Sequence, residues 1–326
     1  MAATDVRTAD PALARLLSRT ARRLADGGAT AADVLERDTD EVPAELLAGL
    51  RTVTAAPDRE AGYCVVRGLL DELLDVGPTP PSWDAPAADT TAVDIAIVLV
   101  AFAMGTVFGW RNQQNGRLVH NIVPTRGFEQ MQVGASSSAP LMWHTEDAFH
   151  PQRANLLVLA CVRNPDRVGT RVAGVRRLGL TETQLKVLQR PAVEIRPDDS
   201  YPYRESDGTA ADRGIATVWC DDGPCLRYDP AYTRILDHDP EFAAAYRALT
   251  AAIESYGGDV ALSAGELCLV DNDVAVHGRV SFRPRFDGTD RWLKRIMVST
   301  ARSRPEAAGG YGQQIVQPQV RIGVRA

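Results

Sequence analysis

The first fifty residues repeat their apolar positions with helical spacing. From Asp10 to about Thr54, the segments PALARLLSRTARRLADG and VPAELLAGLRTV place apolar residues three and four positions apart, as in a helix with one buried face. Asp10 stands directly before Pro11, a pairing typical of a helix N-cap and the first helical residue. The pattern predicts a helical N-terminal region within residues 1–60.

The pattern then changes to a strand and a long apolar helix. Residues 62–70, GYCVVRGLL, have the composition of a strand. After a proline-rich loop, residues 91–109, TAVDIAIVLVAFAMGTVFG, predict a helix that is apolar on nearly every side. We expect this helix to pack against a sheet and to support it.

From residue 117 onward, short apolar stretches alternate with Gly, Pro, Asn and Asp, as in antiparallel sandwiches and barrels. The expected strands are 117–124, 129–134, 139–146, 153–163, 170–175, 216–220, 225–229, 265–272, 274–280 and 291–300, with helices near 181–189 and 240–256. The sequence predicts an α+β fold with a double-stranded β-helix (jelly-roll) core over 61–300. We expect residues 1–326 to form a single domain that ends in a mobile tail, 301–326.

Composition narrows the possible partners. The net charge of −6 gives no electrostatic reason to expect nucleic-acid binding. No segment reaches the ~18 apolar residues needed to cross a bilayer, and the N-terminus does not resemble a secretory signal. The five cysteines form no CxxC pair and lie in apolar segments, which favours reduced, buried thiols. We expect a cytoplasmic protein without membrane or nucleic-acid partners; the sequence carries no signal for its oligomeric state.

Two histidines and one glutamate form a candidate metal site. His144 and Glu146, in MWHTEDAFH, follow a strand and are two positions apart, so their side chains should point to the same side. Chance alone would give about half of such chains one His-x-Asp/Glu pair. His277, in VAVHGRV, lies in another expected strand; alone it would be typical of a structural histidine. Together the three match the ligand set of non-heme Fe(II) oxygenases, which leaves other iron positions open.

Two arginines follow in the last expected strand. Arg291 and Arg295 are four positions apart in RWLKRIMV and should face one side, with the apolar Leu293 between them. This arrangement suits an interior that binds two anionic groups. The alternative is a pair of surface salt bridges.

Several ordered motifs make the chain resemble the clavaminate synthase-like branch of the Fe(II)/2-oxoglutarate-dependent oxygenases. They are HTEDAFHP, a threonine 26 residues after the first histidine, VDN followed by HGR, and FDGTDRWLKR. The resemblance extends from about residue 60 to 300 and is strongest at 140–175 and 265–298. It implies that His144, Glu146 and His277 bind Fe(II). It also implies that Arg291, assisted by Thr170, binds the distal carboxylate of 2-oxoglutarate.

The resemblance also suggests how an amino-acid substrate is bound. Arg295 matches the arginine that contacts the substrate α-carboxylate, and Glu146 could accept from the substrate ammonium. Gln114, or its neighbour Gln113, falls near an amine-binding residue of the family.

Asp229 matches one of two acids that contact the guanidinium in arginine-hydroxylating members. The second acid, two residues further on, is replaced here by Ala231. Lysine, ornithine, a cyclised arginine and neutral polar amino acids therefore stay open as substrates beside arginine.

The resemblance implies an enzyme that consumes O2 and 2-oxoglutarate and hydroxylates C3 or C4 of a free amino acid in natural-product biosynthesis. Desaturation or oxidative cyclisation at the same site is an alternative reaction, and a non-catalytic jelly-roll binding protein is an alternative class. The polar segment 196–214 is either a lid over the substrate or a plain surface loop.

Overall fold

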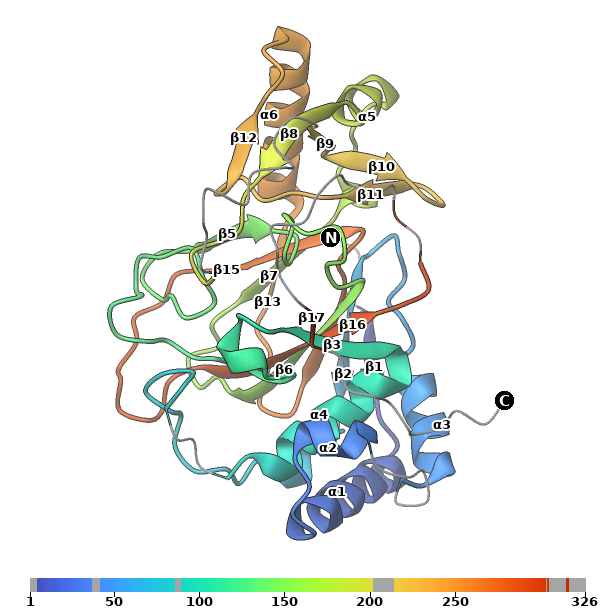
Figure 1. Ribbon diagram of the computed structural model, residues 1–326, viewed down its shortest axis with the longest axis vertical. Helices are drawn as coiled ribbons and strands as arrows, with labels where there is room; N and C mark the ends of the chain where they lie inside the picture. The colour runs from blue at the N-terminus through green and yellow to red at the C-terminus, as the bar shows by residue number, and fades with distance from the viewer. Residues whose placement is uncertain are drawn as a thin grey trace.

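The protein is built on two β-sheets with helices below and above them (Figure 1). The computed structural model describes residues 5–36, 42–85, 89–201, 214–302 and 304, together with the backbone of 315–316. Most of the C-terminal tail expected over 301–326, and residues 202–213 of the candidate lid, lie outside the described residues. The α+β class expected from the sequence is confirmed.

The larger sheet contains eight strands and carries most of the long strands. Its order is β1 (Val6–Thr8), β2 (Tyr63–Arg67), β14 (Leu267–Asp271), β6 (Leu156–Arg163), β16 (Trp292–Ser299), β3 (Thr106–Trp110) and β17 (Ile315–Val316), and β4 (His120–Ile122) also pairs with β16. The pairs are antiparallel except for β1 with β2. The sequence did not predict β1 or β17.

Alternation along β6 separates two hydrophobic cores. Leu156, Val158 and Ala160 belong to the core shared with the N-terminal helices, while Leu157 and Leu159 belong to the core shared with the smaller sheet. Successive side chains of a strand point to opposite faces, so both faces of this sheet are covered.

The predicted N-terminal helices are present and cover the lower face of the larger sheet (Figure 1). They are α1 (Pro11–Asp26), α2 (Ala31–Glu36), α3 (Ala44–Val53) and α4 (Thr91–Met104). Asp10 is the N-cap of α1, as expected: its side chain accepts a hydrogen bond from Ala12 N. Within the described ranges, no helix combines the length and hydrophobicity that a bilayer-spanning helix requires.

The smaller sheet packs against the larger one and encloses the hydrophobic core that the two sheets share. Its order is β13 (Gly258–Val260), β7 (Thr170–Gly174), β15 (Ala275–Arg279) and β5 (Leu141–His144), all antiparallel. Above it in Figure 1 lie α5 (Glu182–Leu188), α6 (Pro240–Tyr256) and two small sheets. These small sheets are β12 (Thr233–Ile235) with β8 (Pro191–Ile195) and β9 (Ile215–Ala216), and β10 (Val218–Cys220) with β11 (Pro224–Leu226).

Three expectations from the sequence were wrong. The helix expected over 91–109 ends at Met104, and residues 106–110 form β3 instead. A side chain at Gly105 would approach Ser299 O to 2.5 Å, so the chain passes here into close contact with β16. Residues 129–134 form consecutive turns such as Met131 N to Phe128 O and Ser136 N to Val133 O, not a strand. Cys220 is exposed because it ends the peripheral strand β10; the other four cysteines are buried.

A buried ion pair joins the larger sheet to α4. Lys294 points to the helix side of β16, where its Nζ lies 2.7 Å from Asp94 Oδ1. Nζ also donates to Asn121 Oδ1 at 3.0 Å and Thr90 Oγ1 at 3.2 Å. Burial lowers the pKa of Lys294, and Asp94 opposes that shift.

We expect loss of the Asp94 carboxylate to destabilise the fold strongly. In Asp94→Ala the buried ammonium keeps only neutral acceptors, so the free energy of unfolding should fall by about 3 kcal/mol. Lys294→Met should cost less, since it removes the buried charge and leaves a partly exposed carboxylate. Urea unfolding of both variants tests this; an equal or larger loss in Lys294→Met would contradict it.

Candidate metal centre and adjoining cavity

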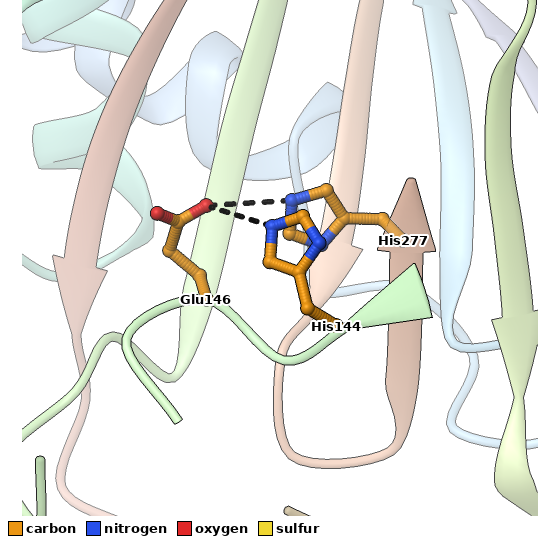
Figure 2. Close-up of side chains that lie close together, drawn as sticks. All are labelled: His144, Glu146 and His277. Carbon is orange, nitrogen blue, oxygen red and sulfur yellow. Dashed lines mark ion pairs between the residues drawn. The ribbon is translucent and has the colours of Figure 1, made fainter. Parts of the chain in front are cut away.

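The three candidate ligands converge between β5 and β15. His144 and His277 are direct partners in this antiparallel pair. Glu146 lies two residues beyond the end of β5 and turns its carboxylate toward both imidazoles (Figure 2). Its Oε2 lies 3.3 Å from His277 Nε2 and 3.9 Å from His144 Nε2. One ligand atom from each residue falls within 4.8 Å of the others, which is a spacing that one metal ion can bridge.

The pKa values of His144 and Glu146 favour a neutral imidazole and an ionised carboxylate, the forms that bind a metal cation. Burial, and then His277, lower the pKa of His144 to about 4. His144 Nδ1 lies 2.9 Å from Met142 O, an arrangement that leaves Nε2 free to bind a metal. Burial would raise the pKa of Glu146, but Arg295 and the two histidines hold it below its usual range. Glu146 Oε2 is buried without a hydrogen-bond partner in the described structure, as expected of a metal-ligand atom.

A cavity between the two sheets adjoins this centre. Among the residues that line it are Ile122 and Leu293 from the larger sheet, and Thr170 from the smaller one. Arg291 and Arg295 both face it, as their spacing predicted, while Lys294 faces α4 on the other side of the sheet. The alternative of two surface salt bridges is wrong because both arginines are largely buried.

Arg291 is a buried cation that lacks a carboxylate partner among the described residues. Its Nη2 donates to Thr170 Oγ1 at 2.9 Å, and its Nε has no hydrogen-bond partner there. Burial lowers the pKa of Arg291 to about 10. A buried guanidinium that keeps donors unused beside a cavity is suited to bind an anionic ligand.

Arg295 contacts the candidate ligand Glu146 directly. Its Nη1 donates to Glu146 Oε1, and its Nη2 donates to His120 Nδ1 at 2.9 Å. Because a guanidinium can only donate, Nδ1 of His120 accepts, and Nε2 carries the proton toward Arg117 O at 3.0 Å. His120 is therefore neutral, in agreement with a pKa lowered to about 3 by burial and by Arg295.

Two carboxylates line the same cavity. Asp229, which the sequence singled out, is joined by Asp198, which it did not. Enclosure in the cavity raises the pKa of Asp229 to about 8, and Asp198 adds to this shift. Asp198 belongs to the polar segment 196–214, which has no periodic pattern. The two consecutive aspartates, Asp198 and Asp199, were the one feature of the sequence that could have indicated a ligand-binding residue here. Ala231 also lines the cavity.

Gln114 does not line this cavity. Its side-chain amide donates to Asn121 O and accepts from Asn121 N, both at 2.9 Å. Gln113, the alternative in the same turn, is buried, and its Oε1 has no hydrogen-bond partner among the described residues. Gln113 does not line the cavity either, so the structure places neither glutamine at the cavity wall.

Known amino-acid hydroxylases are similar to this chain in sequence. A comparison of the chain with models of known protein families finds no match. The chain is 34% identical over 284 residues to an enduracididine beta-hydroxylase of Streptomyces hygroscopicus, covering 80% of this chain and 82% of that protein. It is 33% identical over 263 residues to an L-ornithine/L-arginine 3-hydroxylase of Catenulispora acidiphila, covering 73% and 77%.

Solved structures agree with these relatives. The non-heme iron oxygenase OrfP, in complex with Fe, succinate and (3S)-hydroxy-L-Arg, superposes with a TM-score of 0.78 at 31% identity and covers 91% of this chain and 94% of that chain. OrfP is also known in complex with Fe and alpha-ketoglutaric acid. Asparagine oxygenase in complex with Fe(II), hydroxyasparagine and succinate superposes with a TM-score of 0.74 at 30% identity, covering 90% and 93%.

The raised pKa of Asp229 predicts a pH-dependent stability. The folded protein binds this proton more tightly than the unfolded chain, whose aspartate pKa is about 3.9. The stabilisation is complete below about pH 4 and is lost as the pH rises toward about 8. Asp229→Asn should therefore lose less stability than the wild type between pH 5 and 8.5. Urea unfolding at both pH values measures this, and identical losses would refute it.

Proposed function

The chain belongs to the clavaminate synthase-like family of Fe(II)/2-oxoglutarate-dependent oxygenases, and on that basis we propose that its substrate is a free amino acid with a positively charged side chain. The protein is an amino-acid hydroxylase that uses Fe(II) and 2-oxoglutarate, as its relatives and structural neighbours are. The observation that carries the choice of substrate is the pair of carboxylates, Asp198 and Asp229, on the cavity wall.

In this proposal His144, Glu146 and His277 hold the iron. The fit rests on the two converging imidazoles and on the unpartnered Oε2 of Glu146. Bound iron and 2-oxoglutarate would supply the activation of O2 that hydroxylation of an unactivated C–H bond requires. The protein's part is to orient both ligands and to place one C–H bond of the substrate beside the metal.

Arg291 and Thr170 would bind the distal carboxylate of 2-oxoglutarate. The support is a buried guanidinium with unused donors and an adjacent hydroxyl. Arg279 lines the same region, but its donors are engaged by the main-chain oxygens of Ser136, Ser137 and Ala139 and by the Ser136 hydroxyl. Arg291 is therefore the better candidate for a carboxylate of the cosubstrate.

Arg295 would bind the α-carboxylate of the substrate. Asp198 and Asp229 would bind the positively charged group of the substrate side chain. A carboxylate that approaches Arg295 would share its guanidinium with Glu146. Ala231 stands where arginine-hydroxylating relatives have a second acid. Here Asp198, from another segment, supplies a second carboxylate near Asp229. Two acids favour arginine, ornithine, lysine or enduracididine over a neutral amino acid such as asparagine. Glu146 is the candidate contact for the substrate ammonium, since it lines the cavity and neither Gln113 nor Gln114 does.

The two facing sheets support a jelly-roll core within one oxygenase domain, 1–326. The larger and smaller sheets share one hydrophobic core that includes Leu159 and Val172. The cavity opens between them, which is where sandwich enzymes of this kind can enclose small ligands.

The main test is turnover with a panel of amino acids. We expect succinate release that depends on Fe(II) and 2-oxoglutarate with at least one of arginine, ornithine, lysine and enduracididine, and little with asparagine. The product mass should increase by one oxygen, whereas desaturation or cyclisation would remove two hydrogens. His144→Ala, the control, should be inactive. Preferred turnover of asparagine would contradict the proposal.

The two cavity arginines should affect different ligands. Arg291→Gln should raise the KM for 2-oxoglutarate by about 10-fold or more, and Arg295→Gln should do the same for the amino acid, since each loses a charge-assisted bond to one carboxylate. Steady-state kinetics with each ligand varied in turn would measure this. The assignment fails if both variants change the same KM.

A further inference from the structure

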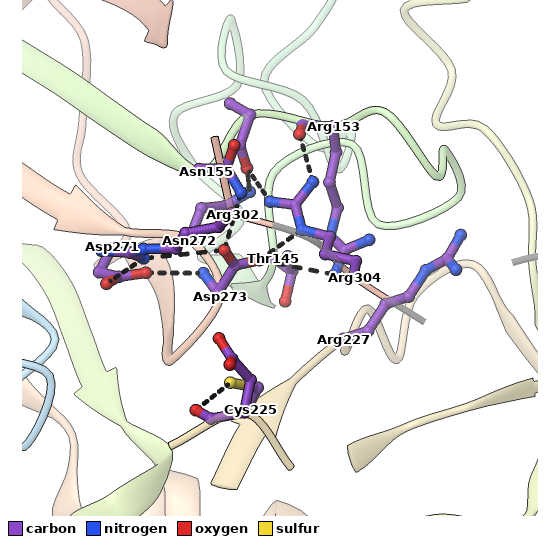
Figure 3. Close-up of polar contacts among 12 residues, drawn as sticks. Thr145, Arg153, Asn155, Cys225, Arg227, Asp271, Asn272, Asp273, Arg302 and Arg304 are labelled. Carbon is purple, nitrogen blue, oxygen red and sulfur yellow. Dashed lines mark hydrogen bonds and ion pairs between the residues drawn. The ribbon is translucent and has the colours of Figure 1, made fainter. Parts of the chain in front are cut away.

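The turn between β14 and β15 carries a side chain that grips the backbone of Glu146. Asn272 is fully buried and lies against the segment that follows β5 (Figure 3). Its Oδ1 accepts from Glu146 N at 2.9 Å, and its Nδ2 donates to Glu146 O at 3.1 Å and to Ala154 O at 3.0 Å. A single side chain thus satisfies both backbone groups of a candidate metal ligand.

The segment after Glu146 has little regular structure of its own to hold this position. Asp147 has a φ of 50°, a left-handed conformation that non-glycine residues adopt at a cost. The carbonyls of Ala148 and Phe149 are bound by the Arg227 side chain rather than by a neighbouring strand. The direction of the Glu146 side chain therefore depends on side chains from other elements: Asn272 binds the Glu146 backbone, and Arg295 contacts its carboxylate.

Asn272 is in turn fixed by the charged residues on either side of it. Asp271 is bound by Arg302 at 2.6 Å, and Asp273 by Arg304 at 2.6 Å; both arginines follow β16 (Figure 3). Arg304 also donates to Ala154 O at 2.7 Å, the same carbonyl that Asn272 binds. The turn and the ligand segment are thus tied together at two points.

We propose that Asn272 is a positioning residue for the metal centre: it sets the place of the Glu146 carboxylate relative to His144 and His277. This inference rests on the proposed metal site. Asn272 does not itself bind the metal, because its side-chain oxygen and nitrogen bind the backbone groups of Glu146 and Ala154. It acts by limiting the positions from which Glu146 Oε2 can reach the metal.

A second asparagine provides a matched control. Asn164 is also buried and makes the same set of bonds in another loop: its Oδ1 accepts from Val168 N at 2.9 Å, and its Nδ2 donates to Val168 O and Leu262 O at 3.0 and 2.9 Å. It contacts none of the three candidate ligands. Asn272→Asp and Asn164→Asp therefore lose equivalent donors, and their costs to folding should be similar.

The experiment measures metal affinity without turnover. Fe(II) binding is followed by anaerobic calorimetry without 2-oxoglutarate, and Co(II) binding by its visible absorption spectrum. We expect Asn272→Asp to weaken Fe(II) binding by 10-fold or more and to alter the Co(II) spectrum, while Asn164→Asp stays within twofold of the wild type. An added carboxylate near the site would by charge alone strengthen cation binding, so a loss points to misplaced geometry.

Three results would overturn the inference. Asn272→Asp could bind Fe(II) as tightly as the wild type, or both variants could weaken binding equally, which would indicate a general loss of stability. A wild-type protein without Fe(II) affinity would overturn the proposed metal site itself. If Asn272→Asp does not fold, Arg304→Gln takes its place: it should weaken Fe(II) binding about threefold, and unchanged binding would count against the role of this turn.

Discussion

The buried ion pair between Lys294 and Asp94 fixes which residues of β16 face the helices and which face the cavity. The site depends on this choice. Side chains of a strand alternate between its faces, so a one-residue shift would exchange the two faces of β16. With Lys294 held under α4, Arg291 and Arg295 must face the cavity. The larger sheet thus presents cations to the cavity while its other face carries the helices. Stability and ligand binding are therefore set by one choice of register.

The sequence predicted what local periodicity controls. His144 and Glu146 are two apart, and Arg291 and Arg295 are four apart, so each pair was expected on one side of the chain, as found. Asp198 was missed because it lies in a polar segment without periodicity, where nothing local indicates which side chain enters a cavity. The predictions of a helix through Gly105 and of a strand at 129–134 were wrong for a related reason. Their conformations depend on Ser299 and on successive local turns, not on the apolar pattern.

The cavity is lined by groups of both charges. Arg291 and Arg295 lie on one side, Asp198 and Asp229 line it as well, and Glu146 stands beside Arg295 at the candidate metal centre. An amino acid with a cationic side chain carries a carboxylate at one end and a positive group at the other. The arrangement would favour one orientation of such a molecule, and orientation decides which C–H bond lies beside the metal. The positions of these charged residues would then decide which carbon of the substrate is hydroxylated.

The pairing of β5 with β15 also has a kinetic consequence. It joins residue 144 to residue 277, and the hydrogen bond from Glu146 to Asn272 spans 126 positions of the chain. Such contacts close late, because the entropy of a long loop must be lost before they form. His277 therefore joins His144 and Glu146 only when β5 has paired with β15. We expect the apoprotein to acquire its fold first and its metal afterwards.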